Sequence, residues 1–391
     1  MKHYILIALS FILSRQLFAQ AEIDMVVAEI LKNNTTLQAL RQNADAEKLG
    51  NKTGIYLSDP EVEFNYLWGS PSLIGTRTDI RVQQSFDFPT AYKFRRQIAD
   101  LRNNQVEFEF QRSQRETATN VRQICVDLTY NQMLRKELSG RVESARRMAD
   151  SYQAKFAAGE ANILEVNKTR LVSLSLSKEL ERLEIEGQEL LSGLARLNGG
   201  IPVNFSASGF QPILVPSDFE QWYAQAGQTN PVLQWLKQQV EVLRKQEKLN
   251  VAQSMPGFQT GYMSEKVVGQ HFQGVTAGIS IPLWENKNTI KHARAQAEAA
   301  QSMEADQKLQ FYNQLKAVHG RAVSLQKNLA DYRQKLQECS NSDLLQKALE
   351  KGEISLVDYL FELTVYYDSV NRLLESERDL NQAWVELNRY N

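Results

Sequence analysis

The side chains that most often carry chemistry are few and scattered along this chain. The four histidines are His3, His271, His292 and His319, and neither they nor the two cysteines stand at the spacing of a metal site. The chain also lacks the G-x-x-x-x-G-K-S/T phosphate loop, the H-E-x-x-H zinc motif and the G-x-S-x-G nucleophile motif. We therefore predict that it is not an enzyme, that it holds no metal or cofactor, and that a partner supplies any energy it uses.

Carboxylates recur instead at two similar turns. In each turn a glycine is followed three residues later by a polar residue suited to the N-cap of a helix, and six residues later by an acidic residue. The residues are Gly159, Asn162 and Glu165 in one turn and Gly352, Ser355 and Asp358 in the other. A left-handed glycine followed by a capping box is typical of a tight connection between two helices, and capping alone is enough to explain both carboxylates.

The composition argues against several classes of protein. The 391 residues carry 45 Lys and Arg against 46 Asp and Glu, so the chain is neither a basic nucleic-acid-binding protein nor a disordered acidic one. Cys125 and Cys339 lie at very different distances from their respective glycine turns, and we expect no disulfide between them. Cys339 falls on an apolar helix seam, which predicts a buried free thiol.

Residues 1–20 have the pattern of a secretory signal peptide. A polar start at Met1–His3 precedes the apolar run Tyr4–Leu13, and small residues follow near Ala19 and Ala21. The mature chain is therefore expected to leave the cytoplasm. No later run reaches the ~18 to 20 continuous apolar residues of a spanning helix, so any membrane span must be made of strands.

Two long segments, 90–201 and 283–391, contain no proline and are rich in Gln, Glu, Leu, Ala, Lys and Arg. Apolar residues recur in both at alternating steps of four and three, which predicts coiled-coil helices. One seam contains Phe311, Leu315, Val318, Ala322, Leu325, Leu329, Tyr332, Leu336 and Cys339. The other contains Val121, Ile124, Leu128, Leu138, Val142, Ala145, Ala149, Tyr152 and Phe156, with Asn131 and Arg135 interrupting it.

The chain also repeats itself. Leu37-Gln-Ala-Leu40 matches Leu233-Gln-Trp-Leu236 at an offset of 196, and Gly159-Glu160 matches Gly352-Glu353 at an offset of 193. We predict a first repeat over 21–200, a linker over 201–216 and a second repeat over 217–391. The first repeat should hold a helix over 22–53, strands at about 61–68 and 77–88, a long helix over 90–157 and a helix over 162–197. The second should hold a helix over 217–253, strands at about 257–264 and 274–284, a long helix over 286–350 and a helix over 355–390.

The predicted strands alternate apolar and polar residues, which indicates one face that avoids water. Val62, Phe64, Tyr66 and Trp68 share one face of the first strand. Lengths of 8 to 12 residues suit a tilted crossing of a bilayer, which needs ~9 to 11. Trp68, Phe88 and Trp284 would then lie at membrane interfaces. The alternative for these aromatic residues is ordinary core packing in a soluble sheet.

Four strands cannot span a membrane alone, because their open edges would leave backbone N–H and C=O groups unpaired in hydrocarbon. Several chains must therefore close the sheet. Two chains would give eight strands with an interior filled by side chains, whereas three would give twelve strands around a water-filled interior. The sequence thus favours a homotrimer.

Four segments of the sequence resemble those of a known protein family. They are the strand-to-helix passages Ile80-Arg-Val-Gln-Gln-Ser-Phe-Asp-Phe-Pro89 and Gly278-Ile-Ser-Ile-Pro-Leu-Trp284, and the turns Phe156-Ala-Ala-Gly-Glu160 and Leu349-Glu-Lys-Gly-Glu-Ile-Ser-Leu-Val-Asp358. Taken in their order along the chain, and over nearly the whole mature chain, they resemble the TolC-like outer membrane efflux proteins. The resemblance implies a homotrimer in the cell outer membrane, with a twelve-stranded transmembrane β-barrel continued by a long periplasmic α-helical coiled-coil barrel. It also implies a passive exit duct that works with a periplasmic adaptor and an inner-membrane pump, which we expect to be of the proton-driven resistance-nodulation-division type.

The same resemblance suggests a role for the two glycine turns. In the family such turns form the periplasmic aperture, and acidic residues six positions after each glycine help to keep it shut; Glu165 and Asp358 match those positions. Leu349, Ile354 and Phe361 stand where the family pattern has a tyrosine, a basic residue and a second acidic residue. A salt-bridge lock of that type is therefore not expected here, and we predict an apolar constriction by these three side chains.

A different class of protein shares many of these features. A periplasmic or surface coiled-coil scaffold would have the signal peptide and the heptads, but no use for two pairs of bilayer-length strands at equivalent points of a duplicated chain. Within the channel interpretation, the sequence does not distinguish export of heavy-metal cations, export of drugs and secretion of proteins.

Overall fold

The computed structural model describes residues 22–207, 209–339 and 342–390, which form two units. The first unit comprises the described residues up to Gln38, Ser113–Ala226 and the part from Tyr312 onward; the second comprises Ala39–Arg112 and Gly227–Phe311. Most of this chain is helical, with one four-stranded antiparallel sheet, which confirms the predicted fold class for the single chain. Among the described helices, none combines the length and apolar character needed to cross a membrane. The predicted signal peptide lies outside the described residues.

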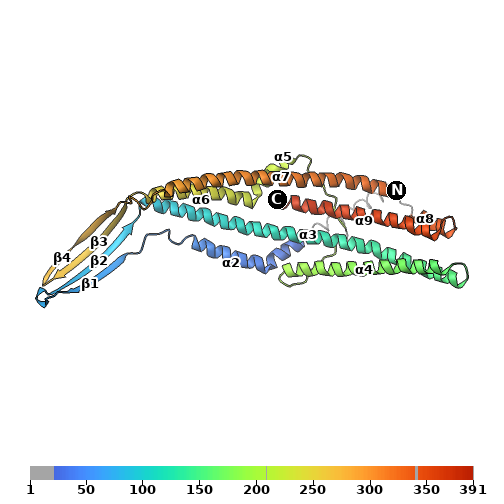
Figure 1. The fold of residues 1–391 in the computed structure, drawn as a ribbon, viewed down its shortest axis with the longest axis horizontal. Helices are drawn as coiled ribbons and strands as arrows, with labels where there is room; N and C mark the ends of the chain where they lie inside the picture. The colour runs from blue at the N-terminus through green and yellow to red at the C-terminus, as the bar shows by residue number, and fades with distance from the viewer. Residues whose placement is uncertain (1–21, 208, 340–341, 391) are drawn as a thin grey trace, which may run out of the picture. The chain divides into compact units, whose positions relative to one another are not determined.

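Long helices dominate the described chain (Figure 1). A helix over 22–33 is followed by α2 (Thr35–Gly50), α3 (Pro89–Ala157), α4 (Ile163–Leu197), α5 (Phe219–Thr229), α6 (Pro231–Gln253), α7 (Thr289–Glu338), α8 (Ser342–Glu350) and α9 (Leu356–Leu387). Pro89 opens α3, where proline loses no hydrogen bond because the first N–H groups of a helix have no partner within it. The predicted heptad seams account for the length of α3 and α7. Leu128, Leu138 and Ala145 of α3 are buried, as are Ala322 and Leu329 of α7.

The sheet belongs to the second unit and has the order β1-β2-β3-β4 (Figure 1). Its strands are β1 (Glu61–Trp68), β2 (Thr76–Phe86), β3 (Gly257–Val267) and β4 (Gln270–Ser280). Each repeat thus contributes one hairpin, and the hairpins join where Val82 of β2 lies opposite Tyr262 of β3. Within the described chain β1 and β4 each pair on one side only, so the backbone of both outer edges is unpaired.

The second hairpin differs from the predicted strands 257–264 and 274–284. β3 and β4 continue to a two-residue turn at Val268 and Gly269, and both turn residues have positive φ angles, of 44° and 85°. Residues 264–274, which include Lys266, His271 and Gln273, were expected to form a loop. They extend the ladder instead: the pairing continues through Lys266 opposite His271 to Val267 opposite Gln270, because the two turn residues with positive φ close a tight hairpin.

Apart from the end beside the turn of the second hairpin, where Lys266, His271 and Gln273 lie on the apolar side, the sheet has one apolar and one charged face. The pairing register aligns apolar side chains from all four strands on one face, where most are exposed: Val62, Phe64, Tyr66, Trp68, Ile80, Val82, Phe86, Phe258, Tyr262, Val275, Ala277 and Ile279. The opposite face carries ion pairs of Arg81 with Glu63 (3.2 Å) and of Arg77 with both Asp79 (2.9 Å) and Glu265 (3.1 Å). The face that avoids water by composition is therefore left uncovered by the described chain.

Two predicted helices are each interrupted at an asparagine. The helix expected over 22–53 breaks at Asn34, and the helix expected over 217–253 breaks at Asn230, at the same 196-residue offset that relates the repeats. Both asparagines are buried. The Asn34 Oδ1 accepts a hydrogen bond from the Leu37 backbone N–H (2.8 Å), and the Asn230 Oδ1 accepts one from the Val232 N–H (2.8 Å). Each asparagine thus caps a new helix, which the apolar periodicity alone did not reveal.

The long helix predicted over 286–350 is also divided. It is present as α7, which begins at Thr289 and ends at Glu338, and as α8, which begins at Ser342. Cys339 is consequently in a turn beyond the end of α7, and its side chain is exposed; the expectation of a buried thiol was wrong. Cys125 is buried and free, and burial raises the pKa of its thiol to about 12.

Removing the buried cap should destabilise the first unit. Asn34→Ala deletes the cap of α2, and it also deletes the donor that reaches the Leu197 carbonyl (2.8 Å), so we expect the unfolding free energy to fall by about 2 kcal/mol. Asp218→Ala, which removes an exposed acceptor from the Gln221 N–H, is the control and should cost about 1 kcal/mol or less. Equal losses for the two variants in denaturant titrations would contradict a specific role for the buried asparagine.

Candidate functional site

The turn after α3 is built by its glycine. Gly159 has a φ of 77°, a left-handed conformation that favours glycine. The Glu160 N–H donates to the Lys155 carbonyl (2.8 Å) and the Gly159 N–H to the Phe156 carbonyl (3.0 Å). This pair of hydrogen bonds defines a Schellman motif, which satisfies carbonyls that the end of the helix would leave unpaired. The predicted left-handed helix end is confirmed.

The turn after α8 repeats the same geometry. Gly352 has a φ of 71°. The Glu353 N–H donates to the Ala348 carbonyl (2.9 Å), and the Gly352 N–H donates to the Leu349 carbonyl (3.1 Å). The two turns are therefore copies of one local structure, as the duplication of the sequence predicts.

The helices after the turns are capped by the residues that the sequence indicated. Asn162 caps α4, and Glu165 completes the capping box by accepting from the Asn162 N–H (2.9 Å). Ser355 caps α9 by accepting from the Asp358 N–H (3.1 Å), but the Asp358 carboxylate accepts from the Ser355 hydroxyl (2.6 Å) rather than from a backbone N–H. Both carboxylates are thereby held beside the turns in fixed orientations, and Asp358 is exposed.

The apolar residues predicted for the aperture differ in their exposure. Leu349 and Ile354 are partly buried, whereas the Phe361 side chain is 66% exposed. Val357 and Val365, one turn on either side of Phe361 along α9, are also exposed. These two valines were not predicted to belong to the site, although their i, i+4 spacing from Phe361 places all three on one face of a helix. The described residues of the chain leave this apolar stripe on α9 uncovered.

A ladder of polar contacts joins α3 to the antiparallel α9 within the first unit. The guanidinium of Arg389, just beyond the end of α9, donates to Glu116 (3.2 Å), and the Gln382 amide of α9 donates to Asp127 (2.6 Å). Further along, the Arg378 guanidinium lies 4.7 Å from the ring centre of Tyr130. Arg141 of α3 then donates to the Asn371 Oδ1 (2.9 Å). Burial raises the pKa of Asp127, although the hydrogen bond from Gln382 opposes that rise.

This ladder was not predicted, because each of its members is a single polar residue on one helix. The spacing gives no signal either. Steps of 11, 3 and 11 residues along α3, from Glu116 to Arg141, face shorter steps of 7, 4 and 7 residues from Arg389, just beyond the end of α9, back to Asn371. Two regular antiparallel helices advance by equal steps, so the reach of the long side chains is needed to make these contacts, and the contacts become visible only in the structure.

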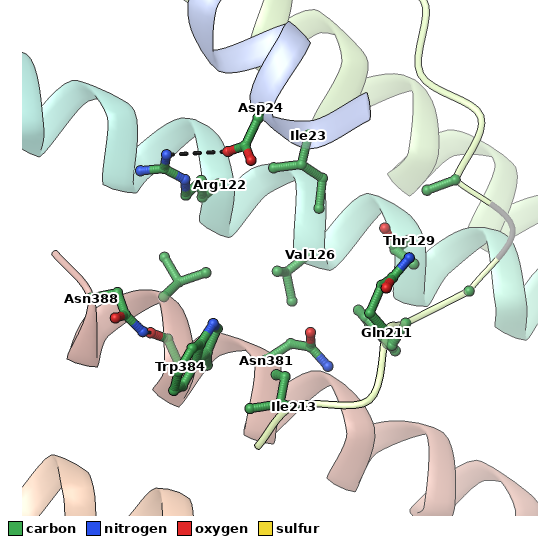
Figure 2. A pocket seen from close by; sticks show the side chains of 14 residues that line it. Ile23, Asp24, Arg122, Val126, Thr129, Gln211, Ile213, Asn381, Trp384 and Asn388 are labelled. Carbon is green, nitrogen blue, oxygen red and sulfur yellow. Dashed lines mark hydrogen bonds and ion pairs between the residues drawn. The ribbon is translucent and has the colours of Figure 1, made fainter. Parts of the chain in front are cut away.

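A cavity of about 330 Å³ lies along the same seam (Figure 2). Arg122, Val126 and Thr129 of α3 line one side, and Asn381 and Trp384 of α9 line another, with further lining from the helix over 22–33 and from the linker. Figure 2 shows the side chain of Gln211, from the linker, beside Thr129. The Gln211 Nε2 is buried without a hydrogen-bond partner in the described chain. The seam between α3 and α9 is therefore joined by polar contacts rather than by close packing along its whole length.

The predicted interface aromatic residues lie at the two ends of the sheet. Trp68 is the last residue of β1 and is 78% exposed. Phe88 follows β2 immediately before α3 and is partly buried, and Trp284 follows β4 and is exposed. Both tryptophans thus point away from any core of the described chain, unlike the alternative of core packing in a soluble sheet.

Comparison with solved structures identifies the fold. No family model and no curated protein matches the chain. It is similar to the outer membrane channel CmeC of Campylobacter jejuni, with a TM-score of 0.78 and 12% identity over 94% of this chain and 85% of that one. It is also similar to CusC (TM-score 0.77, 13% identity, 93% and 91% of the two chains) and to the open state of the Neisseria gonorrhoeae MtrE outer membrane channel (0.70, 11%, 94% and 88%).

These similarities define the class of fold. The chain has the fold of outer membrane channel proteins of the TolC-like type, which confirms the resemblance drawn from its duplicated motifs. At 11–13% identity the likeness concerns the fold. The roles of individual residues at the turns therefore have to be argued from their own geometry.

The turns offer a matched pair of glycine variants. Gly352→Ala places a Cβ at a φ of 71°, and we expect it to destabilise the turn by about 1 kcal/mol or more. Gly140→Ala lies on the exposed surface of α3 with open space around the new Cβ, and should stabilise the protein by about 0.5–1 kcal/mol. Thermal unfolding followed by far-UV circular dichroism measures both. Shifts of the same sign would contradict the left-handed turn.

Proposed function

We propose that the chain is the outer membrane channel of a tripartite efflux system, a passive exit duct for substrates delivered from the inner membrane. The observation that carries the proposal is the sheet, which has an exposed apolar face, a charged opposite face and two unpaired edges. Such a sheet is unfavourable in water, and it is also unfavourable in lipid until its edges are closed. A closed sheet within a bilayer would place its apolar face against lipid and its charged face against water.

Three copies of the chain would close the sheet. Because β1 and β4 run in opposite directions, β4 of one copy would pair antiparallel with β1 of the next. Twelve strands would enclose a water-filled lumen, whereas eight would be filled by side chains. The charged face, with Arg77, Arg81 and their acidic partners, would line that lumen, and the apolar face would contact outer membrane lipid.

The helices would extend the duct into the periplasm. At ~1.5 Å per residue, α3 alone is roughly 100 Å long, a length suited to a partner-facing extension rather than to a compact core. The structural neighbours are described as outer membrane channels, which supports the same location here. The partners would be a periplasmic adaptor and an inner-membrane pump of the resistance-nodulation-division type, which supplies the energy that this chain has no motif to obtain. The exported substrate would be a heavy-metal cation or a drug.

The two turns would form the periplasmic aperture. Three copies of Glu165 and Asp358 would give a ring of six carboxylates, which attracts cations. Leu349, Ile354 and Phe361 would form the constriction, with Gly159 and Gly352 setting the sharp turns that present them. The exposure of Phe361 supports contact with neighbouring copies, since a single chain leaves this large ring in water.

Conductance tests the duct and its constriction. Purified protein added to planar lipid bilayers should form stable channels, and changing Leu349, Ile354 and Phe361 together to Ser should raise their conductance, because a wider and wetter constriction passes ions more readily. An unaltered conductance in the triple variant would contradict the proposed apolar constriction. If the protein formed no channels at all, the proposed duct function would be contradicted as well.

A pair of lysine variants on β4 tests the membrane placement of the sheet. Val275 lies on the apolar face and is 89% exposed, whereas its neighbour Thr276 lies on the opposite face. Val275→Lys should reduce the amount of folded, membrane-inserted protein, since a lysine facing lipid costs about 2–4 kcal/mol near the middle of the bilayer. Thr276→Lys should leave insertion nearly unchanged.

The same pair separates a channel from a scaffold. In a soluble coiled-coil scaffold, Val275 would face water, and a lysine there would leave the yield unchanged or improve it. Equal yields of the two variants in detergent-extracted membranes would therefore favour the scaffold over the channel.

A further inference from the structure

The polar ladder between α3 and α9 stops well before the turns. Its last contact is made by Arg141, which donates to the Asn371 Oδ1 (2.9 Å) and places its guanidinium carbon 4.2 Å from the ring centre of Tyr367. Beyond it, over 142–157 of α3, no described side chain makes a hydrogen bond or ion pair with α8 or α9. About 24 Å of α3, at ~1.5 Å per residue, therefore extends past the last polar contact to the turn.

Polar and apolar contacts restrain a pair of helices differently. Hydrogen bonds and cation–π contacts have preferred directions and fix the register of two helices. Burial of apolar side chains such as Ala145 and Tyr152 of α3 is not directional, so it permits small sliding and rotation. The last polar contact is thus the point beyond which no hydrogen bond or ion pair of a described side chain fixes α3 to α8 or α9.

The Arg141 contact is an unusual one. The side chain is only 6% exposed, yet within the described chain its guanidinium has no carboxylate at ion-pair distance, and its Nε and Nη2 make no hydrogen bond. Burial lowers its pKa from the ordinary arginine value, although the group stays charged at neutral pH. A charge that is buried with one hydrogen bond and one aromatic ring is poorly compensated. Burying an apolar residue at this position would therefore cost less desolvation free energy than burying the arginine.

We propose that Arg141 is a positioning residue that sets the pivot of the periplasmic aperture: its contacts with Tyr367 and Asn371 fix the point below which the two hairpins of each copy move apart. This proposal rests on the proposed channel function. Without Arg141 the next polar contact is that of Arg378 with Tyr130, so the mobile segment of α3 lengthens from about 24 Å to roughly 40 Å. A longer arm gives a larger displacement at the turns for the same rotation.

Arg141→Met tests the pivot, because it keeps an unbranched, flexible side chain that can replace the apolar stem of the arginine and removes its charge and its donors. We expect the open-to-closed ratio of single channels in planar bilayers to rise by about 2- to 10-fold. The matched control is Arg378→Met, which removes the next contact of the same ladder. It should change that ratio by less than about twofold, because Arg141 still fixes the end of the ladder. A purely structural role predicts instead that both variants shift the unfolding temperature and leave the ratio alone.

Two more variants keep the test decisive if Arg141→Met folds poorly. Arg141→Lys retains a cation that can lie over Tyr367, and should restore the open-to-closed ratio most of the way to the unmodified value. Tyr367→Leu combined with Asn371→Ala removes the partners while leaving Arg141 in place, and should reproduce the rise.

The outcomes separate this inference from the channel function on which it rests. Equal ratios for Arg141→Met, Arg378→Met and unmodified protein, in preparations that do form channels, would overturn the pivot and leave the channel intact. A preparation of unmodified protein that inserts no channels would overturn the proposed function, and the pivot with it. A ratio that rises for Arg141→Met and stays unchanged for Arg378→Met is the supporting result.

Discussion

The unpaired edges of the four-stranded sheet constrain everything else in this chain. Backbone N–H and C=O groups along β1 and β4 need partners that the described chain does not supply, and the apolar face that both strands share needs a medium other than water. A bilayer can solvate the apolar face, but only if the backbone groups of the edge strands are already paired, since the hydrocarbon region contains no water to form hydrogen bonds with them. Under the proposed function, neighbouring copies would pair the edges and lipid would cover the apolar face.

The long helices also have apolar surfaces that need to be covered. Heptad seams bury apolar residues such as Leu128 and Leu329, while α9 leaves Val357, Phe361 and Val365 uncovered near the second turn. Two identical Schellman turns close the hairpins, and the asparagine caps at Asn34 and Asn230 interrupt equivalent helices. Duplication thus reproduces fine detail as well as overall order, because each local structure depends on a few residues that both copies kept.

Much of the fold could be predicted from the sequence because its signals are local. The alternation of Val62, Phe64 and Tyr66, the proline-free heptads and the glycine-capping pattern each specify an element through nearby residues. The breaks at Asn34 and Asn230 could not be read in this way, because an asparagine inside an apolar period looks like one polar substitution until its buried partners are seen. The extension of the second hairpin beyond Ser264 was not predicted, because its polar side chains lack the apolar alternation of a strand and its tight turn depends on Val268 and Gly269.

At the candidate site, the helix caps could be predicted from nearby residues. The contacts of Arg141 with α9 could not, because they join residues more than 200 positions apart and neither helix alone indicates them.

The copy number of the chain in its folded state tests the central claim most directly. Light scattering of the detergent-solubilised protein, corrected for bound detergent, measures that number without any assumption about shape. Closed edges predict three copies of the mature chain in each particle, together with precipitation when the detergent is removed. A single copy that stays folded and dispersed in plain buffer would contradict the account, because its edges and its apolar face would then need neither neighbours nor lipid.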